Sequence, residues 1–144
     1  MVNNTTWMVF EILDQVSKAK SRTEKIQILH KNKNNWAMKD ILRGTFDDLV
    51  EWNLPKGKVP YEPADERSVP SNLTNHHRKF AYFLPKTDGA KMPSYKREKM
   101  FLDIIEMVHP KDAELVVGMI NKEMPIKGIT KKLIEEAFPD LIVK

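Results

Sequence analysis

The sequence contains no cysteine, and this absence removes several kinds of chemistry at once. Without thiols the chain forms no disulfide, has no cysteine nucleophile and builds no cysteine-based zinc site. A chain without cysteine also fits a reducing environment, so we expect a cytoplasmic protein.

Long apolar runs are also missing. No stretch approaches the roughly 18 apolar residues that indicate a membrane-spanning helix. Residues 1–6 contain no basic segment leading into an apolar one, so we expect no secretory signal. The sequence therefore predicts no membrane partner.

The motifs of common enzyme classes are absent as well. The four histidines show neither H-x-x-x-H nor H-E-x-x-H spacing, and there is no Walker A loop, G-x-G-x-x-G or G-x-S-x-G. His109 precedes a proline at a helix boundary, where we expect a cap or a partly buried role. We therefore expect no metal, no cofactor, no small-molecule substrate and no catalytic activity.

One tetrapeptide has the form of a catalytic motif. Lys86-Thr87-Asp88-Gly89 matches the K-x-D-G of the nucleotide-acceptor lysine in ATP-dependent ligases. That lysine works in a desolvated nucleotide pocket, which a sheet-rich domain larger than this chain provides. We interpret the tetrapeptide as an Asp-Gly turn in the loop between Pro85 and Pro93.

The residues that are present predict one folded, all-α domain over residues 1–144. Hydrophobic residues make up 41% of the 144 and charged residues 31%, which is typical of a globular chain. Apolar residues recur at three- and four-residue spacing, and no segment alternates with a period of two. We expect a compact bundle of six to seven helices. The expected helices cover residues 6–19, 21–31, 36–43, 72–84, 95–108, 110–120 and 131–138, with a further turn or two within residues 46–52.

Several residues mark where these helices begin and end. Thr6, Ser21, Asn35, Ser94 and Thr130 are expected N-caps. The pattern Ser21-x-x-Glu24 predicts a capping box, Pro110 suits a first helical position, and Gly44 suits the residue after a helix. We expect Trp36, Phe46 and Trp52 to be buried.

A proline-rich segment interrupts the helical pattern. Residues 53–72 contain four prolines, which exclude a helix or a central strand there: Pro55, Pro60, Pro63 and Pro70. We expect an extended loop that crosses the fold, with Val59 and Tyr61 as the residues that fix it to the core.

Positive charge is gathered in two blocks, although the net charge is only +4. Residues 18–43 carry eight basic and two acidic side chains, and residues 78–99 carry seven and two. Residues 47–67 and 103–123 are acidic. Such runs usually serve solubility, but the two basic blocks together are able to form one face that attracts an anionic partner.

Two capped helix starts combine free backbone amides with cations. A helix N-terminus carries partial positive charge, and a small residue beside it lets a phosphate approach. The candidate phosphate-contacting residues lie in two segments of the chain. They are Lys20, Arg22 and Lys25 in the first, and Lys127, Gly128, Thr130, Lys131 and Lys132 in the second.

The same segments carry a likeness to a known family. Residues 12–34 run from Ile12-Leu13 through a Ser-Arg-Thr-Glu-Lys turn to an I-L-H-K-N-K-N run. Residues 114–142 contain a Glu-Leu pair, a turn glycine at Gly128 and an Ala-Phe-Pro-Asp-Leu-Ile ending. These stretches resemble the opening I-L-x-K-N-K-x-N run and the E-V-L…G…P-x-L-I ending of the N-terminal, all-helical DNA-binding domain of ATP-dependent DNA ligases of the T-even bacteriophage type. Residues 53–93 have no counterpart in that pattern.

The resemblance implies a domain that grips duplex DNA across the minor groove near a nick, mainly through phosphates. The nucleotidyltransferase and oligonucleotide-binding domains of the family do not fit in this chain. The resemblance therefore implies a non-catalytic, phage-encoded relative that acts in the infected host.

Two hypotheses follow for the partner. The first is a sequence-independent module for double-stranded DNA in phage replication, repair or recombination. The second is a protein-interaction adaptor that keeps the helical fold and binds a replication or host protein, with the proline-rich, acidic loop of residues 53–72 as its contact. Because fold does not determine function, the two stay open at this point.

Overall fold

The computed structural model describes residues 8–54, 61, 73, 76–84 and 91–141. Within these ranges the chain forms seven helices and no strand, which confirms the all-α prediction. The helices are α1 (Val9–Lys18), α2 (Arg22–Lys31), α3 (Trp36–Phe46), the 3-10 helix η3 (His77–Phe83), α4 (Ser94–Met107), α5 (Pro110–Ile120) and α6 (Lys131–Ala137). None of the helices described is long and apolar enough to cross a membrane.

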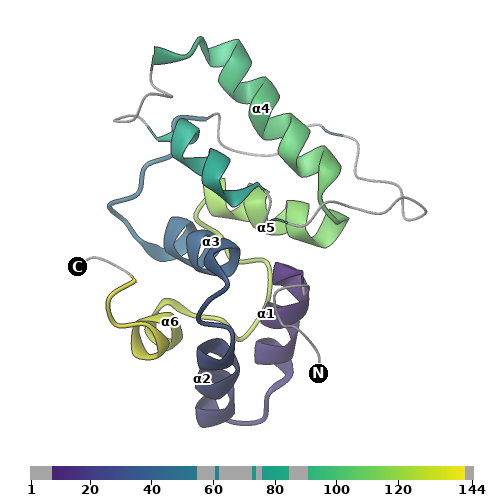
Figure 1. Ribbon diagram of the computed structural model, residues 1–144. Helices are drawn as coiled ribbons and strands as arrows, with labels where there is room; N and C mark the ends of the chain where they lie inside the picture. The colour runs from purple at the N-terminus through teal and green to yellow at the C-terminus, as the bar shows by residue number, and fades with distance from the viewer. Residues whose placement is uncertain (1–7, 55–60, 62–72, 74–75, 85–90, 142–144) are drawn as a thin grey trace.

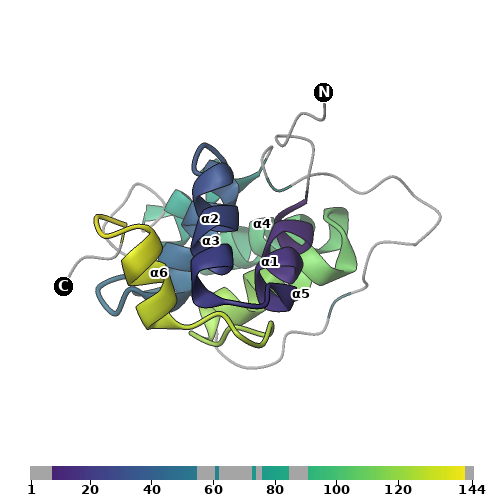
Figure 2. The same cartoon turned by 90° about the horizontal axis from the view of Figure 1, so that it is seen from below.

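The helices are arranged around α3. Figure 1 shows α1, α2 and α6 at one end of the molecule, and α4, α5 and η3 at the other. Figure 2, seen from below, places α2 and α6 in front and α4 behind, which agrees with this division. α1 packs on α2, α2 on α6, and both α3 and α4 pack on α5.

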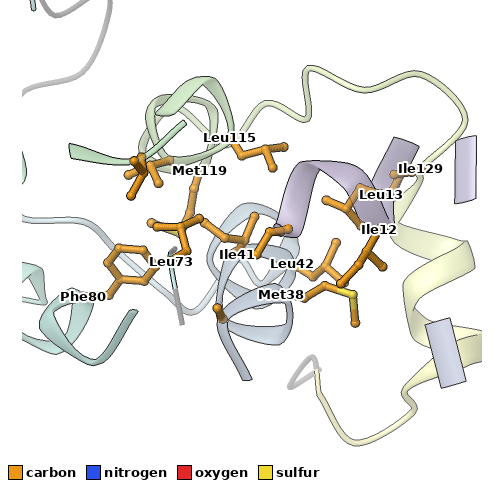
Figure 3. Close-up of a cluster of buried hydrophobic side chains, with 14 of the residues drawn as sticks. Ile12, Leu13, Met38, Ile41, Leu42, Leu73, Phe80, Leu115, Met119 and Ile129 are labelled. Atoms are coloured by element: carbon orange, nitrogen blue, oxygen red, sulfur yellow. The ribbon is translucent and has the colours of Figure 1, made fainter. Parts of the chain in front are cut away.

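One contiguous cluster of buried side chains joins the two ends. Figure 3 shows the buried residues of α3 between those of α1 and those of α5, with Leu73 and Phe80 beside them. The apolar positions of α3 repeat at helical spacing: Ala37, Met38, Ile41 and Leu42. Because α3 is buried against both ends, it fixes how the first two helices lie relative to the last ones.

Most of the expected helix boundaries are confirmed. The Glu24 amide donates to Ser21 Oγ at 3.2 Å, the Met38 amide to Asn35 Oδ1 at 3.0 Å, and the Leu133 amide to Thr130 Oγ1 at 3.2 Å. Pro110 is the first residue of α5. His109 caps α5 by accepting from the Lys111 amide at 3.1 Å. Short-range capping signals therefore located these helix starts correctly.

The position of Gly44 differs from the prediction. α3 continues past it to Phe46, so Gly44 is buried inside a helix instead of following one. A Cβ at this position would lie 2.5 Å from Trp52 Cζ2 and 2.7 Å from Met119 Sδ. The glycine is needed because two side chains from other segments pack directly on the helix backbone.

Other boundaries also differ. Residues 47–52 are not helical and contain a turn at residues 48–49, because the Asp47 carboxylate accepts from the Leu49 amide at 2.9 Å and turns the chain there. The element after residue 72 is the 3-10 helix of residues 77–83. Ser94 is the first helical residue of α4, and the N-cap position is taken by Pro93. α1 begins at Val9, and Thr6 lies outside the described residues.

The proline-rich loop is described only in part. Leu54 is buried, and Asn53 donates its amide to the Phe83 carbonyl at 2.6 Å. Tyr61 is partly buried against the core, as expected. Val59, the loop's prolines and the tetrapeptide of residues 86–89 lie outside the described residues.

Candidate nucleic-acid interface

The first predicted segment forms the turn between α1 and α2. Ser21 caps α2, and the Glu24 carboxylate accepts from the Lys20 amide at 3.1 Å. In an ordinary capping box this carboxylate would bond the amide of the cap residue itself, so here it reaches one residue farther. Both contacts hold the backbone that carries Lys20 and Arg22.

The second predicted segment leads into α6. Gly128 has a φ of +82°, a left-handed conformation that glycine adopts without strain. Ile129 is buried, and Figure 3 shows it beside Leu13 of α1. Thr130 caps α6 through its hydroxyl oxygen, so the hydroxyl proton remains available as a donor.

These two segments meet in the folded protein. Lys25 Nζ donates to the Gly128 carbonyl at 3.1 Å, and Arg22 Nε donates to Glu136 Oε2 at 2.9 Å. A Cβ on Gly128 would lie 3.0 Å from Lys25 Nζ, so the glycine also makes room for this contact. We call the surface formed by residues 20–25 and 127–132 the tip surface.

Several cations of the tip surface are engaged within the protein. Arg22 and Glu136 form an exposed ion pair, and their hydrogen bond raises the pKa of Arg22 and lowers that of Glu136. Lys131 Nζ lies 3.2 Å from Asp48 Oδ2. Lys25 is held by a carbonyl, which leaves its charge uncompensated.

Three other lysines of the tip surface are exposed: Lys20, Lys127 and Lys132. Among the described residues, none of their ammonium groups has an acidic partner within bonding distance. With Lys25, the tip surface thus has four positive charges that no carboxylate neutralises directly.

The second basic block does not join the tip surface. Its described residues lie on η3, on α4 and directly beside these two helices, at the opposite end of the molecule (Figure 1). Arg97 is buried and donates to the carbonyls of Asn53 at 2.8 Å and Met92 at 3.0 Å. The expectation of one face built from both blocks is therefore wrong, because part of the second block holds the fold together.

A groove beside Trp36 was missed by the sequence reasoning. Trp36 is 59% exposed, although we expected it in the core. The helical spacing of α3 indicated this exposure, because its buried positions are 37, 38, 41, 42, 44 and 45 and residues 36, 39 and 43 share the outer face. Trp52 and Phe46, in contrast, are partly buried against the core.

A second hollow lies between α3 and η3. His77 Nδ1 and Asp40 Oδ2 are 2.5 Å apart beside a pocket of about 330 Å³, which Arg43 and Arg78 also line. No group of three or more His, Asp or Glu suited to a metal ion occurs in the part of the chain that the structure describes.

Comparison with known protein families shows which family the chain resembles. Residues 12–125 match the model of a family described as a family of unknown function, DUF6433. The chain belongs to this family. The DUF6433 match includes the first half of the tip surface and ends before its second half at residues 127–132. No curated protein matches the chain.

Proposed function

We propose that this DUF6433 protein is a non-catalytic module that binds double-stranded DNA through phosphates. The observation that supports it is the convergence of the two predicted segments, which the contact between Lys25 and Gly128 joins across 103 residues of sequence. Lys20, Lys127 and Lys132 then present uncompensated charge on the same surface. Phosphate contacts of this kind position a protein on a duplex without reading its sequence.

The likeness to ligase DNA-binding domains supports a role in phage DNA replication, repair or recombination. The tip surface coincides with the segments that carry that likeness. Arg22, Thr130 and Lys131 complete the proposed contact set, with Arg22 and Lys131 exchanging their carboxylate partners for phosphates. Both partner pairs are exposed, so this exchange requires little free energy.

Binding is expected to be weak and dependent on salt. Each neutralised phosphate contributes about −0.9 to the slope of log K against log salt concentration, so the five cations of the proposed contact set give a slope of about −4.5. Fluorescence anisotropy with labelled nicked, intact and single-stranded oligonucleotides across a salt series measures this slope and any preference for nicks.

The deciding variant reverses charge at Lys127 and Lys132. These are chosen because Lys131 pairs with Asp48. The double change Lys127→Glu with Lys132→Glu should weaken duplex binding by at least about tenfold at low salt, because attraction becomes repulsion at two contacts. The matched control is Lys91→Glu with Lys96→Glu, which makes the same charge change on exposed residues at the α4 end. Equal binding by both double variants would contradict the assignment of the tip surface.

The adaptor hypothesis remains the second candidate. It is favoured by the ion pairs of Arg22 and Lys131, which compensate two of the predicted phosphate-binding cations. It predicts no response to nicked or intact duplex at any salt concentration, together with recovery of a replication or host protein in a pull-down.

A further inference from the structure

The groove beside Trp36 lies where the end of α2, the start of α3 and the residues after α6 meet. It has a volume of about 550 Å³, within the range of about 300–1,000 Å³ that small-molecule sites occupy. We call it the Trp36 groove. The residues that line it include His30, Lys33, Trp36, Lys39, Phe138 and Asp140.

The indole of Trp36 is held at the edge of this groove. Tryptophan is usually largely buried, so 59% exposure leaves an unusually large aromatic surface open to solvent. Its position is fixed because Asn35 caps α3 and the neighbouring Ala37 and Met38 are buried. The exposed ring is therefore a fixed feature of the start of a helix and not the end of a loose loop.

A cation holds the two aromatic rings of the groove together. Lys39 Nζ lies 4.5 Å from the centre of the Trp36 ring and 5.1 Å from that of Phe138. His30 contacts the Phe138 ring edge-on and bonds the Ala137 carbonyl through Nε2 at 2.6 Å. The walls of the groove are thus organised before a ligand arrives, which lowers the entropy lost on binding.

The charges in the groove favour an anion. Lys33 and Lys39 contribute two positive charges, and Asp140 is the one acidic residue among the described residues that line the groove. An exposed aromatic face beside cations matches the chemistry of an unpaired nucleotide, whose base stacks on a ring while its phosphate meets a lysine. An acidic peptide would use the lysines and leave the indole face without a role.

We propose that the Trp36 groove binds one unpaired nucleotide of DNA, with its base stacked on Trp36 and its phosphate at Lys33. This rests on the proposed function in that it concerns the same nucleic acid. α2 has ten residues and is about 15 Å long, and the tip surface and the groove lie at its two ends, so their spacing is comparable to the rise of about four base pairs. A strand end, gap or flap near a bound duplex supplies such a nucleotide, whereas a continuous duplex does not.

The experiment measures anisotropy of labelled oligonucleotides with the full chain. The probes are a blunt duplex, the same duplex with a three-nucleotide single-stranded overhang, and a short oligo-dT. Trp36→Ala should weaken binding of the overhang duplex and of oligo-dT about tenfold, because a stacking contact is lost, and leave the blunt duplex unchanged. Trp36→Tyr keeps an aromatic face and should retain most of the binding.

The matched control is Tyr95→Ala, since Tyr95 is an aromatic residue on α4 that is 67% exposed. It should bind all three probes like the parent. Circular dichroism checks that Trp36→Ala keeps the parent's helix content, which is expected because Trp36 is 59% exposed and is not one of the buried core residues.

The outcomes separate this inference from the proposed function. Duplex binding by the parent, with no effect of Trp36→Ala on overhang or oligo-dT, overturns the inference alone. Oligo-dT binding that depends on Trp36, without duplex binding, supports the inference and overturns the proposed function. A poly-glutamate peptide that binds with the same dependence on Trp36 as oligo-dT also overturns the inference, because the site would then not distinguish a nucleotide from a carboxylate chain.

Discussion

The two ends of the molecule carry similar numbers of basic residues and use them differently. At the α2 and α6 end, long-range contacts bring Lys25 to a carbonyl and leave three lysines exposed beside it. At the α4 end, Arg97 turns inward to bond two carbonyls, and Lys99 pairs with Asp103 of its own helix at 3.4 Å. A basic run in a sequence can therefore stay exposed as a charged surface or hold a fold together, and its tertiary contacts decide which.

The hydrogen bond between Asp112 and Phe10 joins the two ends of the molecule, and changes to it should have the largest effect on the free energy of unfolding. Asp112 of α5 is fully buried and accepts from the Phe10 amide of α1 at 2.8 Å, while its Oδ2 has no hydrogen-bond partner among the described residues. Burial raises the pKa of this carboxyl from 3.8 to about 7; the Phe10 amide opposes the rise and Glu11 adds to it. The folded protein thus keeps a proton that the unfolded chain releases near pH 4.

The stabilising effect of that proton is complete below about pH 4 and is lost as the pH rises through 7. The free energy of unfolding should fall by about 4 kcal/mol across this range from Asp112 alone. Urea unfolding at a series of pH values measures it. Asp112→Asn should remove this decline and keep the bond to Phe10.

Two other groups change the free energy of unfolding with pH in the opposite direction. Comparing the parent with Asp112→Asn at each pH separates the contribution of Asp112 from theirs. Burial and Lys79 lower the pKa of His76, which removes stability as the pH falls below about 6.5. The lowered pKa of Glu136 also removes stability, as the pH falls below about 4.5. An unchanged pH profile in Asp112→Asn would show that the carboxyl does not keep its proton in the folded state.

Removing Arg97 should have the next largest effect. Arg97→Ala leaves the carbonyls of Asn53 and Met92 without this donor and should lower the free energy of unfolding by about 3 kcal/mol. The control is Lys132→Ala at the tip surface, where a change within about 0.5 kcal/mol is expected. A similar loss in the free energy of unfolding for both variants would contradict the conclusion that basic residues hold the fold together at the α4 end and not at the tip surface.

The smallest effect is expected for the ion pair of the tip surface. Arg22 and Glu136 are both exposed, so solvent screens their interaction and Arg22→Ala should leave the melting temperature unchanged. The same variant should reduce the salt dependence of duplex binding by about one phosphate contact. A clear fall in melting temperature would assign Arg22 to the fold instead of to the DNA contact.

The sequence predicted those features that depend on neighbours along the chain. The caps at Ser21, Asn35 and Thr130 and the proline start of α5 involve residues three or fewer apart, so local patterns located them. The candidate phosphate contacts were placed in both tip segments because each is a capped helix start with lysines, whereas the contact that brings the segments together spans 103 residues. The likeness to ligase DNA-binding domains stays a prediction.

Features that depend on distant packing were missed. Gly44 looked like the end of a helix because the side chains that pack on it, Trp52 and Met119, come from other segments. The inward turn of Arg97 depends on carbonyls at residues 53 and 92, which no local pattern reveals. Trp36 was placed in the core because of its size, although the spacing of α3 assigned it to the outer face.

The bond between Lys25 and the Gly128 carbonyl also has a consequence for biosynthesis. Ribosomes deliver the chain from its N-terminus, and domains fold as their segments emerge. The α1–α2 hairpin is made early, but its counterpart around Gly128 follows all of α3, α4 and α5. A nascent chain whose first helices alone have emerged therefore lacks the completed tip surface, which forms only after synthesis has passed α6.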